Sequence, residues 1–360
     1  NGVDLWLQAS AESLIVEQGT VKGMRIAWRD ATRVVWARGG VVLATGGFAA
    51  GDQAAGQRPA TDSEHWTMSP PANVGDGHRL AASVNAALGD HLSANFFWAP
   101  VSVLHKADGS VERFPHLVTD RAKPGVIAVN RAGQRFVNES DSYHCFVEAM
   151  FANGGANAPC WLICDSEALN HYGMGLARPR PVDNSALIKA GYLFRADSLT
   201  ELAQLTRIDA ATLAQTVAHY NADAEQGVDR QFGKGSNAYN RYMGDPLHQP
   251  NPCLKPLHKA PFYAVRVFTG DLGSARGLVT NAQANVLDRH HAPIPGLYAA
   301  GNEMNSIMDG TYPGPGITLG PGITFGYLAA NDIARRLDRQ TAQPAPTGEH
   351  HVLRTAHLHD

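Results

Sequence analysis

The sequence predicts an α/β fold in which one ligand-binding domain is interrupted by an inserted α+β domain. Short apolar segments run into glycine turns near both ends of the chain, VVLATGG at 41–47 and GLYAAGN at 296–302, as buried strands of an α/β sheet do. Between them, aromatic residues, arginines and prolines become more frequent. We therefore expect one domain built from residues 1–95 and 258–340, an insert over 96–257, and a flexible tail over 341–360.

Local patterns predict the elements of the first part. Residues 10–28 alternate between apolar and polar types around Gly19, which predicts a β-hairpin. The apolar strand that enters the turn at Ala44–Gly47 comes next. Residues 49–75 are rich in glycine, alanine and proline and are predicted to form a loop. The turn of VGDGH at 74–78 is predicted to lead into a helix.

The insert is predicted to contain a hairpin and two helices. GVIAVNRAGQRFVNES at 125–140 is typical of a hairpin with its turn at Ala132–Gly133, and Arg135 and Glu139 are interpreted as a structural ion pair. Ser198 and Glu201 have the spacing of a capping box, and Gly227 ends the second helix. Beyond the insert, strand patterns return at 261–268 and 277–288, and a helix is predicted to about residue 337.

Composition excludes several classes of protein. The chain has 360 residues, 44% of them hydrophobic, and a net charge of -3, which gives no basic surface for nucleic acid. No apolar run approaches the length of a membrane-spanning helix, so no integral membrane segment is expected. Four cysteines are few for this length and favour a reducing, cytoplasmic compartment. Cys160 and Cys164 are interpreted as buried thiols, and no metal site is predicted.

The stretch GTYPGPGITLGPGITFGYLAA at 310–330 is the most informative part of the sequence. Its first thirteen residues contain five glycines and three prolines, and an apolar helical pattern follows. Glycine lets a ligand approach the backbone, proline stiffens a loop, and the first turn of a helix offers free N–H groups. Together with the turns after the strands at 41–43 and 296–299, this stretch predicts one large flat or anionic ligand at the carboxyl edge of a sheet.

These motifs resemble one known superfamily. VVLATGGF, NVGDG, RFVNES and GLYAAGN…TYPGPGITLGPGITFGYLAA are similar to the flavoproteins that include fumarate reductases and 3-ketosteroid dehydrogenases. The resemblance implies a Rossmann-like FAD-binding domain interrupted by a catalytic domain, with FAD as cofactor. Fumarate reductases carry a catalytic arginine in a HGANRLGGNS-like segment, whereas this chain has DGTYPGPGIT and no arginine between Gly301 and Ala330. The Tyr-x-Gly-Pro-Gly pattern therefore favours the 3-ketosteroid dehydrogenases, which use an apolar ketone substrate and an external electron acceptor.

The sequence departs from this superfamily near its start. Its members begin with a strand, a G-x-G-x-x-G turn and a helix that bind the FAD pyrophosphate, and no such turn precedes a helix here. We therefore expect the FAD-binding domain to be incomplete at its N-terminus and to lack the dinucleotide-binding unit, together with a further catalytic tyrosine.

Three catalytic residues are carried over by the resemblance. Tyr312 and Gly316 are predicted to bind the ketone oxygen through a phenol O–H and a backbone N–H, which would stabilise an enolate. Tyr143, shortly after RFVNES, is the candidate base, and its pKa of about 10 must then be lowered or relayed through a partner. Tyr172 and Tyr242 are further candidates for the pocket. NFFWAP at 95–100 and YLF at 192–194 are candidates for its apolar lining.

The predicted FAD contacts lie in the three glycine turns. They are Thr45, Gly46 and Gly47 in the first turn, Gly301, Asn302 and Glu303 in the second, and Ile317, Thr318 and Leu319 before the helix. The N–H groups of this last set would approach the flavin pyrimidine oxygen. Asp76 is interpreted either as a cofactor contact or as a helix-capping residue.

Two alternatives to a ring-desaturating dehydrogenase stay open at this point. The first is a flavin-dependent reductase of an unsaturated acid or enone, which needs a cation for the substrate carboxylate; His105, His116, Arg121 and Arg178 are available. The second is an inactive truncated remnant, which would follow from the missing dinucleotide-binding unit.

Overall fold

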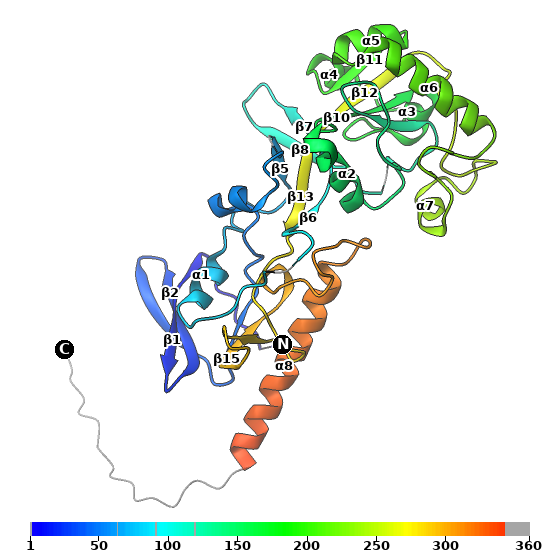
Figure 1. Cartoon of the computed structure of the whole chain (residues 1–360). Coiled ribbons are helices and arrows are strands. Elements are labelled where there is room, and N and C mark those ends of the chain that lie inside the picture. The colour runs from blue at the N-terminus through cyan, green and yellow to red at the C-terminus, as the bar shows by residue number, and fades with distance from the viewer. Residues whose placement is uncertain (1, 63, 91, 119, 343–360) are drawn as a thin grey trace, which may run out of the picture.

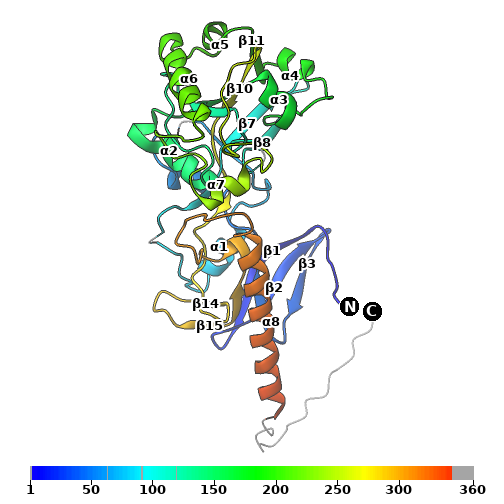
Figure 2. The same cartoon turned by 90° about the vertical axis from the view of Figure 1, so that its right-hand side faces the viewer.

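The chain folds into two lobes that are joined by a small central sheet (Figure 1). The structure is a computed structural model that describes residues 2–342 except 63, 91 and 119. Residues 343–360 of the predicted tail lie outside the described residues. Segments from both ends of the described chain make the first lobe, and the middle of the chain makes the second (Figures 1 and 2).

The first lobe contains two three-stranded sheets. The antiparallel order β1-β2-β3 joins β1 (Ala9–Glu17), β2 (Thr20–Trp28) and β3 (Ala31–Trp36). The predicted hairpin at Gly19 is confirmed, and both turn residues, Gln18 and Gly19, have positive φ as a tight hairpin requires. The second sheet has the order β14-β15-β4, from β14 (Asn285–Leu287), β15 (Pro293–Ala299) and β4 (Val41–Leu43).

Strands β4 and β15 determine where the glycine turns lie. They are parallel neighbours, with Val41 opposite Leu297 and Leu43 opposite Ala299. Because parallel strands end at the same edge, the turns that follow them lie together. Helix α1 (Asp76–Ala82) packs beside this edge, and the long helix α8 (Leu319–Ala342) extends along the lobe (Figure 2).

The second lobe is built on a four-stranded antiparallel sheet covered on both faces. Its order is β11-β12-β10-β9, from β11 (Leu193–Ala196), β12 (Phe262–Val267), β10 (Cys160–Asp165) and β9 (Val126–Val129). Successive residues of β9 and β10 enter opposite cores, which explains their continuous apolar sequence. Helices α2 (Tyr143–Gly155) and α3 (Ser166–Tyr172) cover one face, and α5 (Leu199–Thr206) and α6 (Ala210–Glu225) cover the other.

The remaining elements of this lobe are short. They are the hairpin of β7 (Val101–His105) and β8 (Val111–Pro115), with helices α4 (Ser185–Lys189) and α7 (Ala238–Met243). The capping box before α5 is confirmed, because Glu201 N donates to the Ser198 hydroxyl at 3.2 Å and the Glu201 carboxylate accepts from Asp197 N. Gly227 follows α6 with a φ of +69°.

The predicted ion pair lies inside this lobe. Arg135 binds the Glu139 carboxylate through two hydrogen bonds of 2.8 Å and also pairs with Asp229 at 2.9 Å. All three side chains are at most 1% exposed. Removing one partner of such a buried pair costs about 3–5 kcal/mol, so this cluster is structural.

Two sequence-based predictions need correction. Residues 49–75 are not all loop, because η1 (Asp52–Gln57) and β5 (His65–Thr67) form there. Strand β5 pairs with β13 (Thr269–Ser274), whose other neighbour is β6 (Phe96–Trp98), and a three-residue strand is too short to give an alternating pattern. The turn at Ala132–Gly133 forms, but the hairpin continues only as a single bridge from Val129 to Arg135 because Arg135 turns into its buried ion pair.

The cysteines and the lengths of the helices can be compared with the expectations from composition. Cys160 and Cys164 are buried and unpaired, as predicted. Within the described ranges, the structure contains no helix with the length and apolar character needed to cross a membrane.

Candidate active site

The two turns that follow β4 and β15 are held together by one carboxylate. Glu303 is completely buried, and its Oε2 accepts hydrogen bonds from the Thr45 hydroxyl and from Gly47 N, the latter at 3.2 Å. Its Oε1 lies 3.5 Å from His78 Nε2. The structure thus brings Thr45, Gly47 and Glu303 together. The Glu303 carboxylate binds the turn after β4 and is not exposed to solvent.

The loop before α8 differs because its backbone is open. Gly316 has a φ of +97°, and a Cβ built on it would have no atom within 4 Å. Ile317, Thr318 and Leu319 lie at the N-terminus of α8, where backbone N–H groups have no partner within the helix. Because these groups are at the positive end of a 24-residue helix, the loop is suited to an oxygen that carries negative charge.

An open cleft of about 570 Å³ lies against this loop and the first turns of α8. Its lining is mainly apolar and includes Ile307, Ile317 and Phe325. On α8, Leu319 and Ile323 are 67% and 64% exposed, which extends the apolar surface. Such a surface suits a flat apolar group.

Tyr143 and Tyr312 meet at the inner end of the loop. Their ring centroids are 4.7 Å apart, and both side chains are buried. Tyr143 begins α2, whose first turn is capped by Ser142, while Tyr312 comes from the loop itself. Phe97 packs edge-on against Tyr312 with centroids 5.3 Å apart, so one residue of NFFWAP does reach the tyrosines.

The electrostatics of Tyr143 bear on its predicted role as base. Burial, followed by its hydrogen bond with Tyr312, raises the pKa of Tyr143 far above its ordinary value. Arg121 acts in the opposite direction, but more weakly. Tyr143 is therefore a neutral phenol here, and the lowered pKa that a base needs is not provided by the described residues.

The sequence analysis missed one residue of this site, Tyr239, and considered another, Arg121, only for a substrate carboxylate. Arg121 is buried, is near enough to Tyr143 to affect its pKa, and donates to the backbone oxygens of His116, Leu117, Glu139 and Asp141. Tyr239 on α7 contacts the loop, with its ring 3.9 Å from the Cβ position of Gly314, and burial raises its pKa. Tyr239 lies about 100 residues along the chain from Tyr143, so no local pattern could have identified it.

Other predicted residues lie elsewhere. Asp76 is exposed in the first turn of α1 and pairs with Arg79 at 3.2 Å. Tyr172 donates to Asp245, and Tyr242 is 83% exposed. Tyr192 and Phe194 of YLF line a separate cavity.

The four cations considered for a substrate carboxylate are not brought together. His105 lines the same separate cavity, and His116 is bonded to Asp120 and Ser102. Arg121 is used by backbone carbonyls, and Arg178 is exposed.

A model of the FAD binding domain family matches residues 1–319, and the chain therefore belongs to this family. The match also confirms FAD as the predicted cofactor.

Similar proteins refine this class. The chain is 38% identical to the 4-oxocyclohex-2-ene-1-carboxylate 5-dehydrogenase of Sinomonas cyclohexanicum, over 93% of this chain and 57% of that protein. It is 38% identical to the 3-oxosteroid 1-dehydrogenase of Mycolicibacterium smegmatis, over 92% of this chain and 59% of that protein. A crystal structure of 3-ketosteroid delta1-dehydrogenase from Sterolibacterium denitrificans, in complex with 1,4-androstadiene-3,17-dione, superposes with a TM-score of 0.84 at 41% identity.

These comparisons confirm the resemblance to 3-ketosteroid dehydrogenases and the FAD-binding flavoenzyme fold of mixed helices and strands. The superposition covers 93% of this chain and 60% of the solved chain. The chain thus spans about three fifths of the length of the relatives it matches.

The residues present fit FAD. Gly301, Gly316 and Gly320 all face open space, since a Cβ on any of them would meet nothing within 4 Å. The N–H groups at the N-terminus of α8 suit the charged end of a flavin ring, and the apolar cleft suits its flat face.

Proposed function

We propose that this chain carries the catalytic part of an FAD-dependent dehydrogenase that introduces a double bond next to a ring ketone. The observation that carries the proposal is the contact of Tyr143 with Tyr312, placed beside an open glycine loop that fits FAD. FAD, when bound, supplies the acceptor for a hydride. All other steps are assigned to residues of the chain.

Tyr312 and Gly316 are proposed to bind the ketone oxygen. The phenol O–H of Tyr312 is in an apolar cluster, where a hydrogen bond to a developing enolate is stronger than in water. Gly316 would add a backbone N–H from a residue with no bulk around it. Both donors lie on the same loop, so a change in the loop changes both.

Tyr143 is proposed to take the proton from the carbon next to the ketone. Its raised pKa makes ionisation in the described structure unfavourable, so Tyr143 would accept this proton only while it passes its own hydroxyl proton to Tyr312, whose hydroxyl proton would move to the ketone oxygen. Its contact with Tyr312 supplies one hydrogen-bonded neighbour for such a relay. Tyr239 and Arg121 are near this pair and would help to position it.

The substrate is proposed to be an apolar ketone, with 3-ketosteroids as the first class. Phe97, Leu117 and Ile317 pack around the two tyrosines. The nearby guanidinium of Arg121 is saturated by backbone oxygens and has no donor left for a substrate carboxylate. This arrangement favours an uncharged substrate over the unsaturated acid of the reductase alternative, and reoxidation is proposed to use an external electron acceptor.

The finer domain assignment is also a proposal. The parallel pairing of β4 with β15 supports one FAD-binding domain made from residues 1–95 and 258–340, and the sheet of β9–β12 supports a catalytic insert over 96–257. A Rossmann-like unit incomplete at its N-terminal side is consistent with the small size of the β14-β15-β4 sheet.

The test uses the 360-residue chain reconstituted with FAD and freed of excess cofactor. We expect a retained flavin absorbance band that bleaches on addition of 4-androstene-3,17-dione, and a product two hydrogens lighter by mass spectrometry when an acceptor dye is present. Turnover of 4-oxocyclohexanecarboxylate instead would move the substrate class to cyclic keto acids.

Two outcomes would contradict the proposal. Reduction of an enone or unsaturated acid by the pre-reduced protein, without steroid oxidation, would favour the reductase. Absence of both flavin retention and turnover would favour the inactive remnant.

A further inference from the structure

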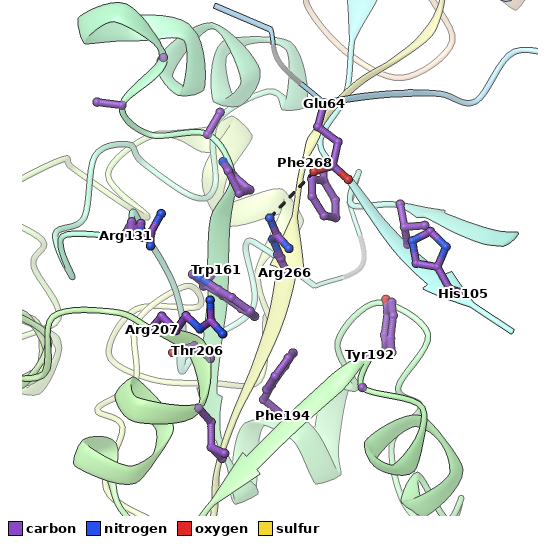
Figure 3. A pocket seen from close by; sticks show the side chains of 17 residues that line it. Glu64, His105, Arg131, Trp161, Tyr192, Phe194, Thr206, Arg207, Arg266 and Phe268 are labelled. Atoms are coloured by element: carbon purple, nitrogen blue, oxygen red, sulfur yellow. Dashed lines mark ion pairs between the residues drawn. The ribbon is translucent and has the colours of Figure 1, made fainter. Parts of the chain in front are cut away.

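A second cavity lies in the catalytic lobe, away from the two tyrosines. Its volume is about 510 Å³, and it opens between the four-stranded sheet, the β7–β8 hairpin and the turn after α5 (Figure 3). None of the residues that pack around Tyr143 and Tyr312 lines it. The cavity is therefore separate from the candidate active site.

Three arginines from separate elements lie around this cavity. Arg131 comes from the turn after β9, Arg207 from the end of α5, and Arg266 from β12 (Figure 3). Its lining contains one carboxylate, Glu64, which is 3.9 Å from Arg266. Within the described ranges, the side chains of Arg131 and Arg207 have no hydrogen-bond or ion-pair partner. The lining thus carries an excess of positive charge that the protein does not neutralise.

The position of Arg207 is unusual for an arginine. It caps α5 with a φ of 58° and a ψ of 37°, a left-handed conformation that glycine normally adopts at a helix C-terminus. A side chain here strains the backbone by about 1 kcal/mol. Because glycine would fit this backbone without strain, we attribute the presence of arginine to its guanidinium, which lies at the edge of the cavity.

Aromatic rings form the apolar part of the cavity. Trp161 and Phe194 pack edge to face, with centroids 5.1 Å apart, and Phe268 lies beneath the Arg266 guanidinium at 4.7 Å. Tyr192 also lines the cavity. Its hydroxyl is hydrogen-bonded to the Ser102 hydroxyl at 2.6 Å and accepts from Leu176 N at 2.9 Å, so Tyr192 contributes mainly its ring. Rings beside unpaired guanidinium groups match a ligand that is both flat and anionic.

We propose that this cavity binds an organic anion with a flat apolar ring and a carboxylate or phosphate group. The anionic group pairs with Arg131 and Arg207, which present fork-shaped donors to oxygen pairs. The ring packs on Trp161 and Phe194. Because the cavity shares no residue with the tyrosine site, this ligand is additional to the ketone substrate and FAD.

The test is isothermal titration calorimetry of the full chain with three probes of the same shape. 2-Naphthoate and 2-naphthyl phosphate carry the two anionic groups, and 2-naphthamide is their neutral counterpart. We expect at least one anion to bind at least about tenfold more tightly than the amide, and the stronger anion identifies the chemical source. Equal affinity for all three probes, or no binding by any of them, would overturn the proposal.

Variants locate the binding. Arg207→Gln and Arg131→Gln should each weaken anion binding by about tenfold or more, while Arg178→Gln, an exposed arginine of the same lobe outside the cavity, should leave it unchanged. Thermal unfolding checks that each variant is folded. Unchanged anion binding in the folded double variant of Arg131 and Arg207 would show that the anion binds elsewhere and would refute the assignment.

Discussion

The turn after β4 and the loop before α8 are both rich in glycine, but their glycines have different neighbours. A Cβ on Gly47 would lie 1.9 Å from Ser274 Oγ and 2.7 Å from Asn302 O. A Cβ on Gly316 or Gly320 would meet nothing within 4 Å. The first turn is closed by the protein itself, whereas the second loop faces open space. Glycine therefore serves packing in one place and ligand access in the other.

The largest effect is expected for the hydroxyl that the open loop provides. Tyr312→Phe in protein that holds FAD should reduce turnover of a 3-ketosteroid by about 10²–10³, the usual loss for one oxyanion donor. Flavin absorbance should stay unchanged, and the melting temperature should fall by a few degrees because the buried Tyr143 loses a hydrogen-bond partner. Steady-state dye reduction measures the loss, with Tyr242→Phe, at an 83% exposed position, as control. Turnover within threefold of the parent protein would remove Tyr312 from the proposed mechanism.

The next largest effect is expected for a side chain added at Gly47, in the closely packed turn after β4. Gly47→Ala should lower the free energy of unfolding by about 2–4 kcal/mol, because its Cβ overlaps a side chain and a backbone oxygen. Gly109→Ala is the matched control, since Gly109 has the same φ of +82° and no atom near its Cβ. Urea unfolding should show a loss of about 1 kcal/mol in the free energy of unfolding for Gly109→Ala. Equal losses in both would mean that backbone strain, not packing, explains Gly47.

A smaller loss of stability is expected when the Glu303 carboxylate, which binds the turn after β4, is replaced by an amide. Glu303→Gln keeps the shape but weakens the hydrogen bonds from Thr45 and Gly47, so the fold should lose about 1–3 kcal/mol. Urea unfolding of the apoprotein measures this loss, and Glu17→Gln on the exposed strand β1 should be neutral. If Glu303→Gln instead leaves stability intact and abolishes flavin retention, Glu303 contacts the cofactor directly.

The first turn of α8, which follows the open loop, should respond in the opposite direction. Gly320→Ala should stabilise the apoprotein by about 0.5–1 kcal/mol, since alanine favours a helix and its Cβ meets no atom. The same change should weaken FAD retention. Gly326→Ala, also in α8 and also unobstructed, should stabilise the protein without affecting FAD. Parallel behaviour of the two variants in a flavin-retention assay would contradict the ligand role of the loop.

The smallest effect is expected at the central sheet, outside both turns. Burial opposes protonation of His65, but hydrogen bonds and attraction from Asp271 and Asp62 outweigh it and raise the pKa of His65. Its stabilising contribution is complete below about pH 6.5 and is lost as the pH rises through the higher folded pKa. The difference in unfolding free energy between the parent protein and His65→Gln should therefore shrink as the pH rises above about 6.5. A constant difference would show that His65 does not change its protonation in this range.

The sequence predicted local features well and distant contacts poorly. The hairpin at Gly19, the capping box at Ser198 and the strand before the turn at 44–47 depend on neighbouring residues, and each forms. Strand β5 was missed because its partner β13 follows about 200 residues later. Tyr239 and the cavity arginines were missed for the same reason, since only the folded chain brings them to a common point. The motifs singled out Tyr143 and Tyr312, but they predicted neither the contact between the two rings nor the raised pKa of Tyr143, which depends on burial.

The parallel pairing of β4 with β15 also sets an order of events during synthesis. Val41 leaves the ribosome more than 250 residues before its partner Leu297. At about 5–20 residues per second, β4 waits roughly 10–50 s for that partner, while the sheet of β9–β12 is completed first. The first lobe thus carries unpaired strand edges throughout this interval. Slower growth at lower temperature, or chaperones that shield strand edges, should therefore raise the yield of folded protein more than changes to the already complete second lobe.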